Sequence, residues 1–164
     1  MRALLFVLSI PVLLLIIGCE SMSSAPTKIE DQASGIAVTF PGFPVNHTTS
    51  EHPHRRMAAV LHDSISVWLS IVQHGDDFSE EVRTQTLAEA NKMLQQQKFE
   101  KVTRIDSTFH EFPSSLLWYT RNQEQMYHFV VFKDSFIVDL SALITDTSQY
   151  HRIDRYFSSL TILE

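Results

Sequence analysis

Hydrophobic and polar residues alternate with a period of two along several stretches of this chain, the pattern of half-buried β-strands. Residues 36–40 place an apolar side chain at every second position, up to a stop at Pro41. Residues 57–61 and 65–71 are two further apolar stretches, separated by the polar pair Asp63-Ser64. We therefore expect a strand over 36–40, a polar loop over 46–56, and then an antiparallel hairpin.

The period changes to that of an amphipathic helix after Gly75. Ser79 is a suitable N-cap, and Glu80 and Glu81 follow in the first turn, where the helix dipole favours acidic residues. The apolar side of this helix, expected over 80–97, carries Val82, Thr86, Leu87, Ala90, Met93 and Leu94. A second helical pattern after a polar cap at 146–148 places Tyr150, Ile153, Tyr156, Phe157 and Leu160 on one side.

Four strand-like stretches lie between the two predicted helices, at residues 102–109, 116–121, 126–132 and 135–144. The polar segments 122–125 and 133–134 supply turns between the last three. Both faces of the stretch 127–132 are largely apolar, which predicts a central strand that is covered on both sides. Residues 161–163 are expected to add a last short strand.

This element order predicts an α+β fold, an α-β-α sandwich with two main helices packed on a mainly antiparallel sheet of about six to seven strands. The predicted domain organisation is a leader over residues 1–18, a tether over 19–34 and a single domain over 35–164. A domain of this length buries about two-thirds of its unfolded surface, which is enough for one hydrophobic core.

The first residues have the pattern of an export signal. Arg2 precedes fifteen uncharged, largely apolar residues, and Gly18 and Cys19 follow. This apolar run is shorter than the roughly 20 residues of a membrane-spanning helix. The tetrad Ile16-Ile17-Gly18-Cys19 resembles the lipobox of bacterial lipoproteins, in which the cysteine thiol receives a diacylglyceryl group and the chain is cut before it. An uncleaved membrane helix and a soluble secreted protein are the alternatives.

The resemblance to lipoproteins implies a cell-envelope location, with the chain held to a membrane by the lipid on Cys19. Residues 20–34 are small and polar, the composition of a flexible tether. Glu20 follows the cysteine, whereas an aspartate there is the usual signal for retention at the inner membrane. The resemblance therefore favours an outer membrane, facing the periplasm, in a Gram-negative cell.

Charge and cysteine content narrow the possible partners. The chain has a formal charge of −6, and removal of residues 1–18 with Arg2 makes it −7. Such an acidic balance argues against nucleic acid as a partner, because nucleic-acid binding requires clusters of Lys and Arg. Cys19 is the only cysteine. The domain therefore has no internal disulfide and depends on its core alone.

The element order resembles that of a PsbP-like domain, with Gly35-Ile36-Ala37-Val38-Thr39-Phe40-Pro41 at its start and Tyr156-Phe157-Ser158-Ser159-Leu160 at its end. PsbP is the extrinsic protein of photosystem II, and a small Ran-binding protein of nuclear transport shares its sandwich. The resemblance covers about residues 35–164 and implies a binding or assembly factor that is not an enzyme. It places no binding residue in this chain.

A loop rich in histidine is the main candidate for chemistry. His47, His52 and His54 offer imidazole ligands to a divalent metal such as Zn²⁺. The adjacent Arg55 and Arg56 repel a cation, and a carboxylate would have to complete the ligand set because no cysteine is free. A solvated loop without metal is therefore the favoured interpretation, and no cofactor besides the lipid is expected.

Hydrolase and phosphate-binding motifs are absent from the sequence, which has no G-x-S-x-G, S-x-x-K or H-E-x-x-H and no glycine-rich loop. A triad assembled from distant Ser, His and Asp residues stays open. The aromatic residues Trp118 and Tyr119 are expected in the core. Trp68, between Ser66 and Ser70, is a candidate anchor for a partner because exposed tryptophans are frequent at binding hot spots.

Together these patterns predict a membrane-anchored lipoprotein that exposes a non-catalytic binding or assembly module, with another envelope protein as its partner. Two alternatives remain: a metal-binding lipoprotein that uses His47, His52 and His54, and an uncharacterised envelope hydrolase.

Overall fold

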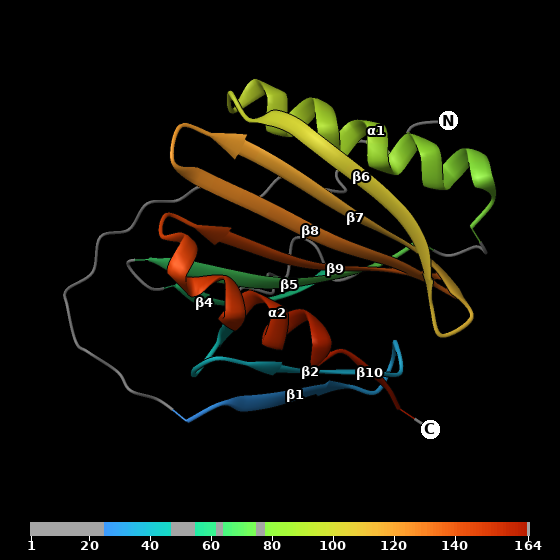
Figure 1. The fold of residues 1–164 in the computed structure, drawn as a ribbon. Coiled ribbons are helices and arrows are strands. Elements are labelled where there is room, and N and C mark those ends of the chain that lie inside the picture. Colours follow the sequence, from blue (N-terminus) through green and yellow to red (C-terminus); the bar gives the residue numbers. More distant parts are fainter. Residues whose placement is uncertain (1–24, 47–54, 62–63, 75–77, 164) are drawn as a thin grey trace.

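The computed structural model describes residues 25–46, 55–61, 64–74 and 78–163. Within these residues the chain forms two antiparallel sheets and two α-helices (Figure 1). The large sheet has seven strands in the order β3-β4-β5-β9-β8-β7-β6, and the small sheet has three in the order β1-β2-β10.

The strands of the large sheet are β3 (Val45–Asn46), β4 (Arg55–Leu61), β5 (Ile65–Gln73), β6 (Glu100–Phe109), β7 (Phe112–Arg121), β8 (Glu124–Lys133) and β9 (Phe136–Ile144). Those of the small sheet are β1 (Thr27–Asp31), β2 (Ile36–Phe40) and β10 (Thr161–Ile162). The helices are α1 (Glu80–Gln96) and α2 (Tyr150–Ser158), and a short 3-10 turn, η1 (Thr147–Gln149), precedes α2.

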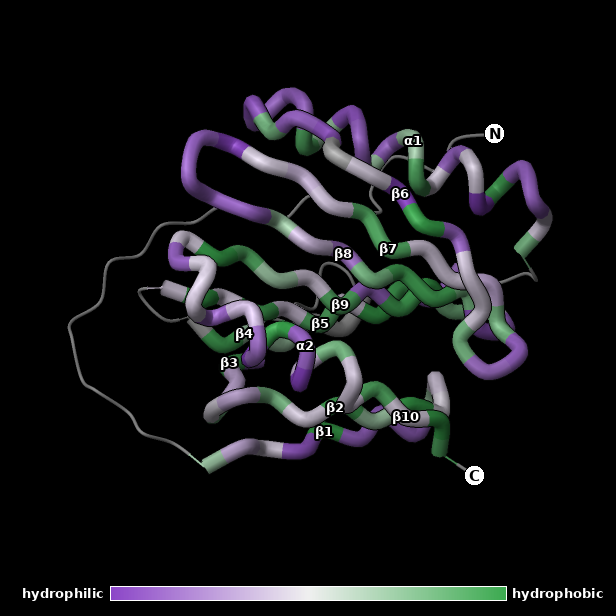
Figure 2. The backbone as a smooth tube through the Cα atoms, in the orientation of Figure 1, coloured by the Kyte–Doolittle hydropathy of each residue, from purple (hydrophilic) through white to green (hydrophobic). Residues whose placement is uncertain are grey.

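The elements form layers around the large sheet. Figure 1 shows α1 on one side of this sheet, and α2 and the small sheet on the other. Each side has its own buried apolar cluster: one joins α1 to β7 and β8, and the other joins α2 and β2 to β5, β8 and β9. Figure 2 shows the hydrophobic residues concentrated along β2, β5 and β9, while hydrophilic residues predominate on α1 and in the β7–β8 turn.

The central strands confirm the prediction that the chain around residues 127–132 is covered on both faces. β8 pairs with β7 and β9, and its residues Met126 to Val131 are buried except for the half-buried Phe129. Every residue of β9 except Leu143 is buried. The predicted hairpin, both helices, the strand run and the closing strand at Thr161 are likewise confirmed.

The start and end of α1 follow from local hydrogen bonding. Ser79 is the N-cap, and its Oγ accepts a hydrogen bond from the Val82 backbone N–H at 3.2 Å. At the other end, the backbone N–H of Phe99 donates to the Leu94 carbonyl at 3.0 Å and that of Lys98 donates to the Gln95 carbonyl at 2.9 Å. This is a Schellman motif, and Lys98 adopts the left-handed conformation with a φ of 65° that the motif requires.

The structure corrects two predictions. The tether was expected to reach Ser34, but Thr27–Asp31 forms β1, which pairs with β2 along its whole length. This strand carries a single apolar side chain, Ile29, so its backbone pairing rather than its pattern stabilises it. The strands were also expected in one sheet of six to seven, whereas β2 leaves the large sheet and pairs with β10 at the end of the chain.

Replacing Lys98 with glycine should stabilise the protein. The left-handed conformation costs a residue with a Cβ about 1–2 kcal/mol, and glycine adopts it without that penalty. Lys98 is exposed, so little packing is lost. We expect Lys98→Gly to raise the free energy of unfolding by about 1 kcal/mol in urea titrations. The matched Lys98→Ala variant should leave it unchanged, and an equal gain in both variants would contradict this account.

Candidate functional site

The two faces of the large sheet are covered to different extents. α1 packs across one face, here called the α1 face. On the opposite face, the α2 face, α2 contacts β9 and reaches β8 through ring contacts of Tyr150 and Phe157. β6 and β7 lie beyond β8 at the edge of the sheet. The outer part of the α2 face is therefore the less covered surface of the sheet.

An apolar strip occupies this outer part and consists of Ile105 on β6 and Leu116 and Trp118 on β7. Ile105 and Leu116 are paired across the two strands, and Ile105 is 55% exposed. Leu116 and Trp118 are half-buried. The Trp118 ring stacks on Tyr127 at 5.9 Å with an interplanar angle of 8°, which fixes its orientation. The strip is thus a small, preformed apolar surface beside an edge strand.

A buried polar cluster lies on the opposite, α1 face, formed by His128, Asp139 and Ser141, whose exposed fractions are 2%, 4% and 2%. The Nδ1 atom of His128 lies 3.1 Å from Asp139 Oδ2 and 3.0 Å from Ser141 Oγ. The Ser141 hydroxyl also donates to Asp139 Oδ1 at 2.9 Å. β8 and β9 bring the three together because His128 and Ser141 are cross-strand partners.

These residue types are those of a serine hydrolase, but their arrangement is different. A catalytic triad places the serine hydroxyl at one ring nitrogen of the histidine and the carboxylate at the other, so that the ring transfers the proton. Here both groups lie at Nδ1, and Nε2 is buried without a hydrogen-bond partner among the described residues. The cluster is therefore arranged as a structural hydrogen-bond network.

Tyr119 on β7 lies next to this network. Its ring lies edge-on to the His128 ring at 6.3 Å, and its hydroxyl is buried without a partner among the described residues. Burial, the largest cause, raises the pKa of Tyr119 to about 12, and the charge of Asp139 also raises it. The tyrosine is thus kept neutral and contributes no base.

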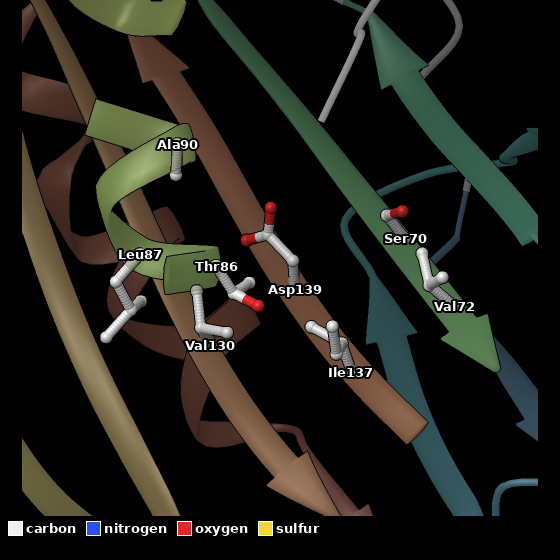
Figure 3. A pocket seen from close by; sticks show the side chains of 8 residues that line it. All are labelled: Ser70, Val72, Thr86, Leu87, Ala90, Val130, Ile137 and Asp139. Atoms are coloured by element: carbon white, nitrogen blue, oxygen red, sulfur yellow. The ribbon is translucent and has the colours of Figure 1, made fainter. Parts of the chain in front are cut away.

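A cavity beside the network is too small for a substrate. Its volume is about 10 Å³, and it lies between α1 and strands β5, β8 and β9 (Figure 3). Thr86 and Leu87 from the helix and Ser70 and Asp139 from the sheet contribute to its lining, together with apolar side chains. A single water molecule requires about 10–15 Å³. The cavity therefore accommodates at most one water molecule.

The metal and lipid residues predicted from the sequence lie outside the described residues. These are Cys19, His47, His52 and His54. In the described part of the chain, no three His, Cys, Asp or Glu side chains are placed to hold a metal ion. No helix in that part is both long and apolar enough to cross a membrane. The lipid and metal predictions therefore stay predictions.

Trp68 lies on β5 with its side chain on the α1 face, between the cross-strand neighbours Ala59 and Ser141. It is half-buried and packs against the apolar cluster beneath α1. Ala59, the cross-strand neighbour of Trp68, also pairs with Val45 on β3, and Val45 is 59% exposed. The role of Trp68 as a partner anchor stays a prediction.

The apolar strip is not apparent from the sequence. The pattern predicts Trp118 in the core and does not distinguish Ile105 from other strand residues. The period-two pattern in Thr103-Ile105-Ser107 was visible, but it does not tell which strand ends the sheet. Only the strand order shows that β6 is terminal and that Ile105 has no covering layer.

The network generates a stability prediction. Asp139→Ala leaves the His128 N–H and the Ser141 O–H buried without their acceptor, so we expect a loss of about 2–4 kcal/mol in the free energy of unfolding. The triple variant His128→Leu, Asp139→Leu, Ser141→Ala removes every member and should lose less than Asp139→Ala alone. Urea unfolding followed by circular dichroism measures both, and a triple variant less stable than the single one would refute the assignment.

Comparison with known proteins identifies the fold. No family model matches the chain, and no curated protein matches its sequence. Among solved structures, the cyanobacterial PsbP protein CyanoP from Synechocystis superposes with a TM-score of 0.63 at 11% identity, over 90% of this chain and 98% of that one. The protein of unknown function PA94 from Pseudomonas aeruginosa gives a TM-score of 0.43 at 12% identity, over 81% of this chain and 92% of that one.

At such low identity the superposition on CyanoP bears on the fold alone. It covers nearly the whole of both chains and agrees with the order of strands and helices expected from the sequence. The chain therefore has a PsbP-like fold.

Proposed function

We propose that this protein is a lipid-anchored, non-catalytic binding module of the cell envelope that docks another envelope protein. The observation that carries the proposal is the apolar strip of Ile105, Leu116 and Trp118 on the uncovered edge of the large sheet. The arrangement of the His128 network, which lacks the geometry of a triad, supports a role without catalysis.

The edge strand β6 has the features of a site for strand addition. It is ten residues long, and no other strand of the described chain pairs with its outer side. An extended segment of a partner can hydrogen-bond to such an edge and place its side chains over the adjoining face. Charged side chains usually protect such an edge from further pairing. On β6, Lys101, Arg104 and Asp106 lie on the α1 face, whereas Glu100 at the start of the strand pairs with Thr120 on the α2 face.

Charge is distributed unequally around β6. Arg104 and Asp106 lie on the α1 face and form an ion pair at 2.6 Å. On the α2 face, the middle of the strand carries the uncharged Thr103, Ile105 and Ser107, and Glu100 lies at its start. A partner that covers residues 103–107 on this face therefore meets an apolar side chain between two polar ones, and it buries no charge of that segment. An extended segment with an apolar residue opposite Ile105 fits this surface best.

The proposed anchor places this edge away from the membrane. β1 begins at Thr27, so only residues 20–26 separate it from Cys19. Seven residues span at most about 25 Å when fully extended. Figure 1 shows β1 at the bottom of the molecule and β6 near the top, next to α1. A domain held at β1 would present β6 towards the compartment and its proteins.

Site-specific crosslinking tests the docking surface. A photoreactive amino acid at Thr103 should give one reproducible adduct in cells, because Thr103 lies beside the apolar strip. Introducing Ile105→Glu in the same chain should reduce that adduct at least tenfold, since it buries a charge in the contact. Lys92→Glu on the exposed side of α1 serves as the matched control and should leave it unchanged. An adduct that survives Ile105→Glu would refute docking at this strip.

Lipid attachment is tested separately. Metabolic labelling with a palmitate analogue should label the wild-type chain and not a Cys19→Ser variant, which lacks the thiol that receives the lipid. The variant should also leave the membrane fraction, because acyl chains supply about 0.8 kcal/mol of membrane binding per buried CH₂ group. Mass spectrometry that finds an intact Met1 and an unmodified Cys19 thiol in the native protein would exclude the anchor.

A further inference from the structure

A polar hollow of about 390 Å³ lies where the β7–β8 turn faces the segment between β9 and η1. Amide side chains from Asn122, Gln123 and Gln125 line one part of it. We propose that this hollow binds a neutral carbohydrate, with Tyr150 at its rim as the ring against which a sugar packs. This proposal is independent of protein docking at the apolar strip.

The lining matches the chemistry of sugar hydroxyl groups. Besides the amides, three threonine hydroxyls line the hollow, those of Thr120, Thr145 and Thr147. Amide and hydroxyl side chains both donate and accept hydrogen bonds, as each sugar hydroxyl does. Most of these side chains are exposed, and Thr120 and Gln125 are half-buried. The volume of about 390 Å³ has room for a small oligosaccharide, which would remain partly exposed because the hollow is open to solvent.

The electrostatics of the hollow favour an uncharged ligand. No Lys or Arg belongs to its lining, so a phosphate or carboxylate finds no cation there. The one acidic member, Asp146, already accepts hydrogen bonds from the Ser148 backbone N–H at 2.9 Å and from the Ser148 hydroxyl at 2.7 Å. These bonds lower the pKa of the Asp146 carboxyl group and hold it as the N-cap of η1.

The nearest ion pair points away from the hollow. Arg121 and Glu124 pair at 2.6 Å on the α1 face of the β7–β8 hairpin. Arg121 is further held by a hydrogen bond to the Gln97 carbonyl at 2.8 Å and by its position over the Phe99 ring at 4.2 Å. Its charge is therefore satisfied by the end of α1, on the face opposite Thr120 and Gln125.

Aromatic rings adjoin the polar lining on one side. Tyr127 donates a hydrogen bond from its hydroxyl to Gln125 Oε1 at 2.5 Å, which leaves the Gln125 amide N–H groups as donors for a ligand. The Tyr150 ring packs edge-on against Tyr127 at 5.7 Å and an interplanar angle of 75°, and Tyr150 is 52% exposed. Tyr150 follows η1 directly, and its contact with Tyr127 places its ring next to the residue that bonds Gln125 of the lining.

An exposed ring beside polar groups is the combination that a sugar requires. The C–H groups of a sugar ring carry partial positive charge, and the face of an aromatic ring is negative. The hydroxyl groups at the edge of the same sugar need several donors and acceptors at once. The neutral carbohydrate is therefore the ligand class that the lining favours.

Titration with neutral oligosaccharides tests this inference. The purified, isotope-labelled full-length chain in phosphocholine micelles is titrated with cellotetraose and with tetra-N-acetylchitotetraose, and its amide NMR signals are followed. We expect saturable shifts confined to residues 120–125 and 145–150 with at least one of the two, and a Kd of about 1 mM or below. The absence of saturable shifts with both sugars, or binding of tripolyphosphate in their place, would overturn the proposal.

Variants separate ring stacking from a general disturbance. Tyr150→Ala should weaken binding at least tenfold, whereas Tyr150→Phe, which keeps the ring, should bind within about threefold of the wild-type affinity. Gln123→Ala, in an exposed turn, should also weaken binding while the protein stays folded. Lys92→Ala on α1 is the matched control. Ile105→Glu should leave sugar binding unchanged, so failure of the docking proposal and failure of this one are distinguishable. Equal affinity in Tyr150→Ala and wild type would refute the role of the ring.

Discussion

The pairing of β8 with β9 at the centre of the large sheet is the constraint on which the rest of the structure depends. Both strands are buried on both faces, so each face needs its own covering layer. α1 supplies one layer, and α2 with the small sheet supplies the other. Because no internal disulfide is possible with one cysteine, these layers and their apolar contacts hold the domain together.

The same constraint separates the residues of catalytic type from the surfaces that are free to bind a partner. His128, Asp139 and Ser141 lie beneath α1, where covering is complete, and their hydrogen bonds are directed to one another. The hydrogen bonds among the three residues offset the cost of burying them, although Nε2 of His128 has no partner among the described residues. The open surfaces are at the edge strand β6 and at the turns, where ordinary side chains such as Ile105 and Tyr150 are exposed.

The sequence predicted elements well where the pattern was local. The apolar side of α1, the Ser79 cap and the strand run from residue 102 to 144 each depend on neighbours within one element, and all were found. β1 was missed because its only apolar residue gives no pattern and its stability comes from pairing with β2. The separation of the two sheets was missed because it depends on pairing between β2 and β10, at opposite ends of the domain.

The candidate sites were less predictable for the same reason. The polar hollow combines a hairpin turn with a segment about twenty residues later, and the buried network combines adjacent strands in a particular register. The pattern places the turn at 122–125, but it does not give the register that sets His128 opposite Ser141, because a shift of two residues keeps the same face buried. Exposure is hard to predict for the same reason. The hydrophobic pattern of β6 is like that of an inner strand, and only the terminal position of β6 in the sheet leaves Ile105 uncovered.

The presence of β1 also changes what the proposed anchor would do. Because β1 already belongs to the domain, the segment between Cys19 and the domain is about half as long as the composition suggested. A shorter segment confines the domain to a thin layer next to the bilayer and raises the effective concentration of any partner fixed in that layer. The individual contacts at an apolar strip of three side chains are weak, and confinement offsets that weakness. A small docking surface is therefore consistent with a module whose partners share its membrane.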